Sequence, residues 1–345
     1  MTRAAVTKAA LPDLDPYVGF ALFRELGRQL ELPIVETNTD FSVQTANGEI
    51  ALQVQGNAVG LTLRAANDVR LHALKQVVFA RLARLDRQVV PKWDHVAAGA
   101  LPPNLSVAKV ASVDRISPHF SRVRVTGQGL QRFGDGGLHF RLLLAQNGHE
   151  PVWPRIAPDG RTVWPDGDDV LHRPVYTTRA FDPAGTWLDF DVFLHEGGRV
   201  TDWTYMAAAG DPVGLMGPSG SDIPQAAWVG LFGDETALPA IARILVALHQ
   251  DTVGLAFVLL GDLSDAQALQ HPLGVKLHWL KRGAGDDLNA ALRALTLPES
   301  DRFVWFASEA SEASAARSYL RDGRGFGRAQ TNISGFWTAE TGGSD

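Results

Sequence analysis

The sequence of 345 residues contains no cysteine. This absence excludes disulfides, thiolate nucleophiles, and zinc or iron–sulfur clusters held by cysteine, and it fits a cytoplasmic protein. Histidine remains as a possible metal ligand. Its ten residues are scattered without an HxH or HExxH spacing, so we assign no metal site.

Long apolar runs and an excess of positive charge are also lacking. No run approaches the ~20 apolar residues that cross a bilayer, and residues 1–15 hold no apolar stretch long enough for a signal peptide. The net charge is −6, and lysine and arginine form no dense run. We therefore expect a cytoplasmic protein that has no stable membrane association and binds no nucleic acid. The oligomeric state stays open.

What the sequence does contain divides into three segments, the first of which covers residues 1–95. Asp15 and Pro16 begin a helical pattern that continues to Leu30. Asn47-Gly48 indicates a β-hairpin between strand patterns, and Asn67 caps a second helix. A helix, three or four antiparallel strands and a helix predict a small α+β domain. Residues 89–105, with several Pro and Gly, are expected to form a linker.

The second segment, residues 105–224, consists of short strands between Gly and Pro turns. Alternating or continuous apolar patterns occur in five places, at 107–113, 121–126, 140–145, 187–195 and 212–216. Six or so strands at this spacing predict a small closed β-barrel.

In the third segment, residues 225–345, strands alternate with helices. Strands are expected at 228–232, 254–260, 275–280, 302–307 and 330–337, with helices between them. This order predicts a doubly wound parallel α/β sheet of about five strands. Ligands of such sheets bind outside the carboxyl ends of the strands, so we expect the ends at 233–236, 261–262, 281–282 and 308–309 to converge.

Two stretches of the barrel segment could bind a flavin. In the strand Arg173–Arg179, an aromatic ring can stack on the flavin, a hydroxyl can bond its polar edge, and guanidinium groups can pair with phosphate. The alternative is a half-buried strand with a solvated Arg edge. In the stretch His195–Trp203, Gly197 and Gly198 let the backbone approach a pyrophosphate at a helix start. The alternatives here are a plain strand-to-helix turn, and a structural hydrogen bond for His195.

The turn Gly233–Thr236 joins the first strand of the parallel sheet to a helix. Such a turn presents free N–H groups and a partial positive charge to an anion, although acidic residues and Thr are also common as plain helix caps. Neither a GxGxxG nor a GxxxxGK[ST] motif occurs. The acidic pair Asp234-Glu235 argues against a phosphate cradle.

These features resemble those of the siderophore-interacting proteins, FAD-dependent ferric-siderophore reductases with the ferredoxin-reductase architecture. The matching stretches are YTTRAFD (176–182), LDFDVFLHEGG (188–198), AAGDPVGLMGPSG (208–220), GDETALPAIARIL (233–245), WLKR (279–282) and GFW (335–337). The resemblance covers residues 105–340. It implies a six-stranded antiparallel Greek-key barrel that binds FAD (105–224) and a domain that binds NADH or NADPH (225–345). The segment 1–95 would be an accessory domain.

The resemblance also implies site residues, and none of them is assigned as catalytic. Three Arg are candidates for the ferric siderophore or the dinucleotide phosphate: Arg282, Arg324 and Arg328. The cofactor candidates are Arg173, Tyr176, Thr177, Arg179, Asp191, Phe193, His195, Gly198, Thr201, Trp203, Gly233, Asp234, Glu235, Thr236 and Trp337.

The chain departs from the family pattern at two places. The Arg that usually stands two residues before the Tyr is shifted to Arg173, because position 174 is Pro. The Arg of the closing motif is replaced by Thr338. The resemblance implies transfer of hydride from NADH or NADPH to FAD and of single electrons to chelated Fe(III), with release of Fe(II) for iron acquisition. The alternatives are a non-catalytic flavin or siderophore carrier or sensor, and a free-flavin or quinone reductase.

Overall fold

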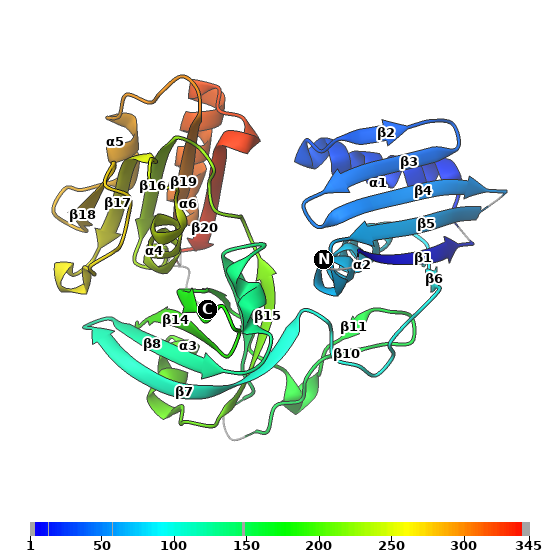
Figure 1. The fold of residues 1–345 in the computed structure, drawn as a ribbon, viewed down its shortest axis with the longest axis horizontal. Coiled ribbons are helices and arrows are strands. Elements are labelled where there is room, and N and C mark those ends of the chain that lie inside the picture. The colour runs from blue at the N-terminus through cyan, green and yellow to red at the C-terminus, as the bar shows by residue number, and fades with distance from the viewer. Residues whose placement is uncertain (1–3, 13, 57, 147–148, 340–345) are drawn as a thin grey trace, which may run out of the picture. The chain divides into compact units, whose positions relative to one another are not determined.

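The computed structural model describes residues 4–12, 14–56, 58–146 and 149–339 (Figure 1). The chain forms two compact units. One comprises Met1–Leu105 with Leu143–His172, and the other Ser106–Leu142 with Arg173–Asp345. Across the described ranges, no helix is long and apolar enough to cross a membrane. The same ranges hold no group of three or more His, Asp or Glu side chains that could bind a metal ion.

The first unit is a six-stranded sheet with two helices. Its main elements are β1 Ala5–Leu11, α1 Pro16–Leu30, β2 Ile34–Glu36, β3 Asp40–Thr45, β4 Gly48–Gln55, β5 Ala58–Ala65, α2 Asp68–Leu82 and β6 Lys92–Trp93. The strands lie in the order β2-β3-β4-β5-β1-β6, and all pairings are antiparallel. The predicted helix starts and the hairpin are confirmed: Asp15 and Asn67 cap the two helices, and Thr45 pairs with Gly48.

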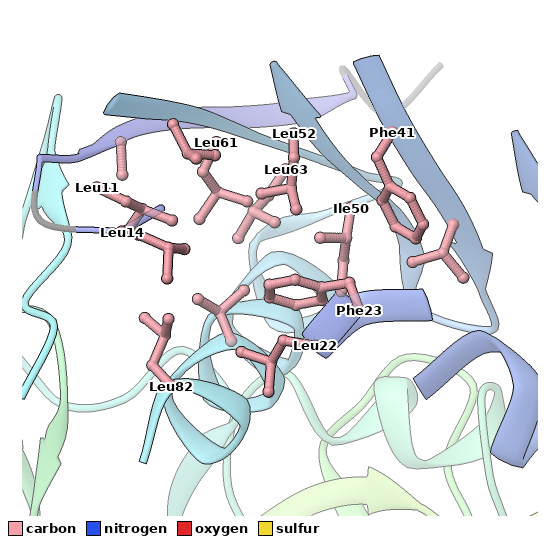
Figure 2. Packing of buried hydrophobic residues seen from close by; sticks show 14 of the residues in the cluster. Leu11, Leu14, Leu22, Phe23, Phe41, Ile50, Leu52, Leu61, Leu63 and Leu82 are labelled. Carbon is pink, nitrogen blue, oxygen red and sulfur yellow. The ribbon is translucent and has the colours of Figure 1, made fainter. Parts of the chain in front are cut away.

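The sheet has more strands than the three or four predicted, because β1, β2 and β6 were not expected. Alternate positions of β1 are buried, but they are occupied by Thr7, Ala9 and Leu11, which give a weak apolar period. The apolar face of the sheet and the two helices enclose one core. Figure 2 shows Phe23 of α1, Ile50 and Leu63 of the sheet, and Leu82 of α2 pointing into it. The expected α+β architecture is therefore present in a larger form.

Residues 143–172 belong to this first unit although they interrupt the barrel segment. They contain β10 Arg155–Ile156, β11 Thr162–Val163 and the short 3₁₀ helix η2 Gly167–Asp169. The hairpin β10–β11 contacts α2 through Thr162, whose Oγ1 lies 3.3 Å from Nε2 of the buried His72. The expected linker 89–105 also joins it, since Gly99 N–H donates to the Ile156 carbonyl at 2.8 Å.

The barrel of the second unit has seven strand pieces. Its elements are β7 Leu105–Ser117, β8 Phe120–Thr126, the 3₁₀ helix η1 Leu130–Gly134, β9 His139–Leu143, β12 Val175–Thr177, β13 Ala180–Phe181, β14 Trp187–Phe193, α3 Arg199–Met206 and β15 Pro212–Ser219. The order is β12-β9-β15-β7-β8-β14-β13. β12 and β13 are one strand broken at Thr178 and Arg179. Its first piece, β12, pairs with β9, and its second piece, β13, pairs with β14. Because this strand joins the two ends of the sheet, the pieces close into the predicted six-stranded barrel.

The α/β part of the second unit is the predicted parallel sheet. Its elements are β16 Trp228–Asp234, α4 Leu238–Ala247, β17 Val253–Leu260, the 3₁₀ helix η3 Leu263–Asp265, β18 Val275–Lys281, α5 Leu288–Arg293, β19 Arg302–Glu309, α6 Ala310–Arg317, the π-helical turn η4 Ser318–Gly323, the 3₁₀ helix η5 Arg328–Gln330 and β20 Thr331–Trp337. The order β18-β17-β16-β19-β20 is all parallel. The strand order reverses between β16 and β19, which is where such folds bind ligands.

Both faces of this sheet are covered, as a doubly wound fold requires. Val229 and Leu231 of β16 pack with α4 in one cluster. Phe232 packs with α5 and α6 in another. The helix expected between β17 and β18 is reduced to η3. The helix expected between β19 and β20 ends at Arg317 and continues as η4.

Candidate functional site

A cavity of about 420 Å³ lies between the barrel and the α/β part of the second unit, a volume typical of small-molecule sites. The barrel wall consists of His139, Val175, Tyr176, Thr177, Asp191, Phe193 and His195. The opposite wall consists of Glu235, Thr236, Pro239, Ser334, Gly335 and Phe336. Seven residues predicted from the sequence thus line one cavity, from the barrel and from the end of β16.

Tyr176 and Thr177 enter the cavity from β12. Tyr176 pairs with Phe140 of β9, and its ring centroid lies 5.4 Å from that of Phe190. Burial raises the pKa of the Tyr176 phenol, so this side chain is a neutral aromatic surface at physiological pH. The Thr177 hydroxyl lies 3.0 Å from Nδ1 of His139.

His139 was not predicted as a site residue. It is the first residue of β9 and pairs with Thr177, while its ring meets Phe336 edge-on at 5.4 Å between centroids. Burial lowers the pKa of His139 to about 4, so its imidazole is neutral at pH 7. No spacing signal identifies it, because only the register of β9 against β12 places it beside Thr177.

Asp191 lines the cavity, but its carboxylate is held by the barrel. Arg122 of β8 donates to both oxygens, through Nε at 2.7 Å and Nη2 at 2.9 Å. Nε of Arg179 lies 3.5 Å from Oδ2 of Asp191, and burial lowers the pKa of Arg179. The geometry therefore gives Asp191 and Arg179 a place in a charged network of the barrel wall, beside the cavity.

The stretch His195–Trp203 forms the start of α3. Gly198 is its N-cap, and within the described chain no side chain caps this helix. A Cβ at Gly198 would lie 2.8 Å from Nε2 of His195 and 2.8 Å from Oγ1 of Thr201, so a larger residue there would have to displace these two side chains. Thr201 is buried and accepts a hydrogen bond from the His195 backbone N–H at 3.2 Å. Trp203 lies in α3, outside the cavity lining.

The turn after β16 is built by internal hydrogen bonds. Asp234 is fully buried, and its Oδ1 accepts from the N–H of Thr236 at 3.0 Å and from its hydroxyl at 2.6 Å. Its Oδ2 accepts from Nε1 of Trp337 at 2.7 Å, which ties β20 to the turn. Burial raises the pKa of Asp234, although these hydrogen bonds act to lower it. Gly233 is explained by packing, because a Cβ there would lie 2.5 Å from Cβ of Ala237.

Glu235 joins the carboxyl ends of three strands. Its Oε1 accepts from the N–H of Gly261, after β17, at 2.5 Å. Its Oε2 accepts from Nη2 of Arg282, after β18, at 2.7 Å. Burial lowers the pKa of Arg282, but the bond to Glu235 and nearby carboxylates outweigh it and raise the value overall. The expected convergence is therefore present for three of the four strand ends, those at 233–236, 261–262 and 281–282.

All five predicted Arg lie outside the cavity lining, and two of them, Arg179 and Arg282, bind the carboxylates of lining residues as described above. Arg173 is exposed just before β12, and its carbonyl accepts from Nη1 of Arg141 at 3.3 Å. Arg324 is exposed and donates to the Tyr319 hydroxyl at 3.1 Å. Arg328 is exposed at the start of η5. Sequence reasoning missed His139, Val175, Pro239, Ser334, Gly335 and Phe336 as lining residues.

Two observations test whether these residues fit a flavin dinucleotide. The cavity combines the aromatic side chains of Tyr176, Phe193 and Phe336 with several polar side chains, which suits a flat heteroaromatic ring that has a polar edge. No side chain of the described residues caps the start of α3, which leaves backbone N–H groups of its first turn for a phosphate. These residues fit the group that the sequence predicts.

Comparisons with known proteins match the same part of the chain. Residues 109–222 match the model of the siderophore-interacting FAD-binding domain, and residues 226–340 match that of the siderophore-interacting protein. The ferric vibriobactin reductase of Vibrio cholerae is 29% identical over 220 residues, covering 60% of this chain and 79% of the relative. The NADPH-dependent ferric-chelate reductase of Escherichia coli is 31% identical, covering 58% and 80%.

A solved structure agrees with these sequence matches. The siderophore utilization protein from T. fusca is 30% identical and superposes with a TM-score of 0.60, covering 70% of this chain and 95% of that one. Both family models begin after residue 108, so they cover the barrel and the α/β part rather than the six-stranded sheet.

Proposed function

We propose that this chain, which belongs to the siderophore-interacting protein family, is an FAD-dependent reductase of ferric siderophores. Its electron donor would be NADH or NADPH. The observation that supports this proposal is the cavity that joins Tyr176 and Thr177 of the FAD-binding domain to Glu235 and Thr236 of the sheet. A flavin bound in this cavity would lie against the ligand crevice of a nucleotide-type fold. We include a cytoplasmic location in the proposal, as expected from the cysteine-free sequence.

Bound FAD would supply the ability to accept two electrons as hydride and to give them up one at a time. The residues of the chain would bind and orient it. Tyr176 would stack on the ring, and Thr177, fixed by His139, would bond its polar edge. Phe193 and His195 would continue this wall towards α3.

The phosphate groups would lie at the start of α3. Thr201 would present its backbone N–H there, next to the N-cap Gly198, with Trp203 on the adenylate side. Arg179 and Asp191 would hold the barrel wall in place through their network with Arg122.

The nicotinamide would enter from the α/β side, at the turn Gly233–Thr236. Thr236 and Pro239 line the cavity there, while Asp234 and Trp337 would fix the shape of the turn. Arg282 is our candidate for the anionic substrate or the dinucleotide phosphate, because it is partly exposed beside Glu235. Arg324 and Arg328 are further candidates for the anionic substrate or the dinucleotide phosphate, and Arg173 is a candidate for the flavin phosphate. Each is supported by its exposure to solvent.

The test uses the purified full-length chain. We expect a flavin absorbance spectrum, release of FAD rather than FMN on heating, and anaerobic bleaching by NADH or NADPH. Mixing the reduced protein with ferric citrate, a ferric catecholate or a ferric hydroxamate should then restore the spectrum, and an Fe(II) chelator should report about two Fe(II) per flavin, because reduced flavin carries two electrons.

Three outcomes would contradict the proposal in different ways. Flavin that neither nucleotide bleaches would indicate a carrier or sensor. Rapid reoxidation by quinone or free flavin, with none by ferric chelates, would indicate a free-flavin or quinone reductase. Absence of any flavin after expression with added riboflavin would remove the proposed cofactor.

A further inference from the structure

Arg243 of α4 is a buried cation that reaches from the α/β part to the barrel. It is 5% exposed. Its Nη1 donates to the Thr178 carbonyl at 3.2 Å, and its Nη2 donates to the carbonyls of Phe133 at 3.3 Å and Gly134 at 2.9 Å. Its guanidinium also lies 5.0 Å from the ring centroid of Phe181.

The partners of Arg243 are unusual for a buried charge. Within the described part of the chain, no carboxylate lies within 4.0 Å of its guanidinium, and burial lowers its pKa. Burying a charge without an opposite charge is costly, and an apolar residue could fill this position of α4 without that cost. The three carbonyls that it satisfies, all in the barrel, therefore indicate what this side chain does.

One of those carbonyls, that of Thr178, directly follows the strand that carries the candidate flavin contacts. Thr178 stands at the break of the strand that carries Tyr176 and Thr177, one residue further along. Phe133 and Gly134 end η1, where a helix leaves carbonyls without partners. A Cβ at Gly134 would lie 2.2 Å from Cζ of Phe181, so this corner is closely packed.

Arg243 lies on the same face of α4 as a residue that lines the cavity. Residues four apart lie one above the other on a helix, and Pro239, four residues before Arg243, lines the cavity. The turn with Thr236 lies immediately before this helix. Arg243 therefore connects the helix that follows the nicotinamide turn to the strand that carries the flavin contacts.

We propose that Arg243 is a positioning residue for hydride transfer, which holds the turn Gly233–Thr236 at a fixed separation from Tyr176 and Thr177. This inference rests on the proposed function for its catalytic part. A displacement of about 1 Å between reacting groups can slow a reaction by about a hundredfold. The hydrogen bonds of Arg243 would fix the separation between the turn and the strand, although Arg243 itself does not touch the reacting atoms.

The test compares three variants of the full chain. Arg243→Met removes all three bonds and keeps an apolar stem, whereas Arg243→Lys keeps the charge but cannot span both groups of carbonyls. Arg302→Met is the matched control. Arg302 also donates to a carbonyl, that of Pro298, and lies 3.7 Å from the ring centroid of Phe326, but it lies at the amino end of β19.

The first readout is amide hydrogen exchange, which needs no activity. We expect Arg243→Met to speed exchange at least tenfold in residues 133–138, 176–181 and 236–243, and Arg302→Met to leave these segments at the wild-type rate. Equal exchange in the wild type and Arg243→Met would overturn the positioning role, whether or not the protein is a reductase.

The second readout separates the two half-reactions. With FAD bound in all variants, we expect NADH or NADPH to reduce Arg243→Met at least tenfold more slowly, Arg243→Lys to be intermediate, and ferric citrate to reoxidise the photoreduced proteins at one common rate. If Arg243→Met and Arg302→Met slow reduction equally, in step with their melting temperatures, Arg243 is only structural. A wild type that neither nucleotide reduces would overturn both the proposed function and the catalytic part of this inference.

Discussion

His139 gives the sharpest quantitative prediction, because its cavity position suppresses its charge. Its pKa in the folded protein is about 4, against 6.5 for an ordinary histidine. Between these values the unfolded chain binds more protons than the folded one, so stability is lost as the pH falls from 6.5 towards 4. A gap of about 2.5 units corresponds to ~3.4 kcal/mol when the titration is complete. Between pH 7.5 and pH 5.0 the linkage relation gives ~2 kcal/mol.

The perturbation is His139→Gln, which removes the titrating group and keeps a side chain that can bond Thr177. The measurement is hydrogen exchange of β9 and β12 amides in the flavin-free protein, corrected for intrinsic rates, at pH 7.5 and pH 5.0. We expect the opening free energy to fall by about 2 kcal/mol more in the wild type than in His139→Gln. His249→Gln is the control, since the side chain of His249 is 79% exposed.

An NMR titration of the wild type provides a direct check of the cause. A His139 midpoint near 6.5 would show that the cavity admits water freely and does not suppress the charge. An equal loss of opening free energy in His139→Gln and the wild type would show that another group carries the pH dependence. Either result would refute the reasoning from burial.

The remaining predictions concern three residues of the cavity. Tyr176→Ala should lower FAD occupancy more than it lowers the melting temperature of the flavin-free protein, since aromatic stacking adds about 0.5–1.5 kcal/mol beyond area burial; an equal loss would favour a core role. Thr236→Ala should keep near-normal FAD content and slow flavin reduction about tenfold or more in stopped flow, which is ~1.4 kcal/mol, with unchanged reoxidation by ferric citrate. Glu235→Ala should lower the unfolding free energy in urea by roughly 1–3 kcal/mol, because it leaves the Gly261 N–H and Arg282 without their acceptor; an unchanged midpoint would contradict this.

Much of the fold follows from local signals in the sequence. The cap at Asn67 and the Asn47-Gly48 turn depend on contacts within a few residues. The helix start and the hairpin that they form can therefore be predicted without knowing the rest of the chain. The alternation of strands and helices after residue 225 predicts the parallel sheet for the same reason. By contrast, β1 is stabilised by its place between β5 and β6, and its small buried residues give no period that predicts it.

The candidate site was predictable where one motif supplies neighbouring residues. Tyr176 and Thr177, or Glu235 and Thr236, are adjacent in sequence and line the same cavity. His139 and Phe336 enter it through the register of β9 and through β20, and register is set by tertiary packing. Residues 143–172 could not be assigned to the first unit either, because the contact of Thr162 with His72 joins positions 90 residues apart.

The acidic turn shows how the structure changes an argument made from composition. Asp234 and Glu235 argue in the sequence against a phosphate cradle, and the structure gives the reason for their presence. Asp234 accepts three hydrogen bonds that shape the turn, and Glu235 accepts from Gly261 and Arg282. Since both carboxylates already have internal partners, a nicotinamide bound at this turn would meet the surface of Thr236 and Pro239 and little free charge. NADH and NADPH differ by one phosphate, so we expect discrimination between them to depend on cations outside this turn, such as Arg282, which Glu235 of the turn binds.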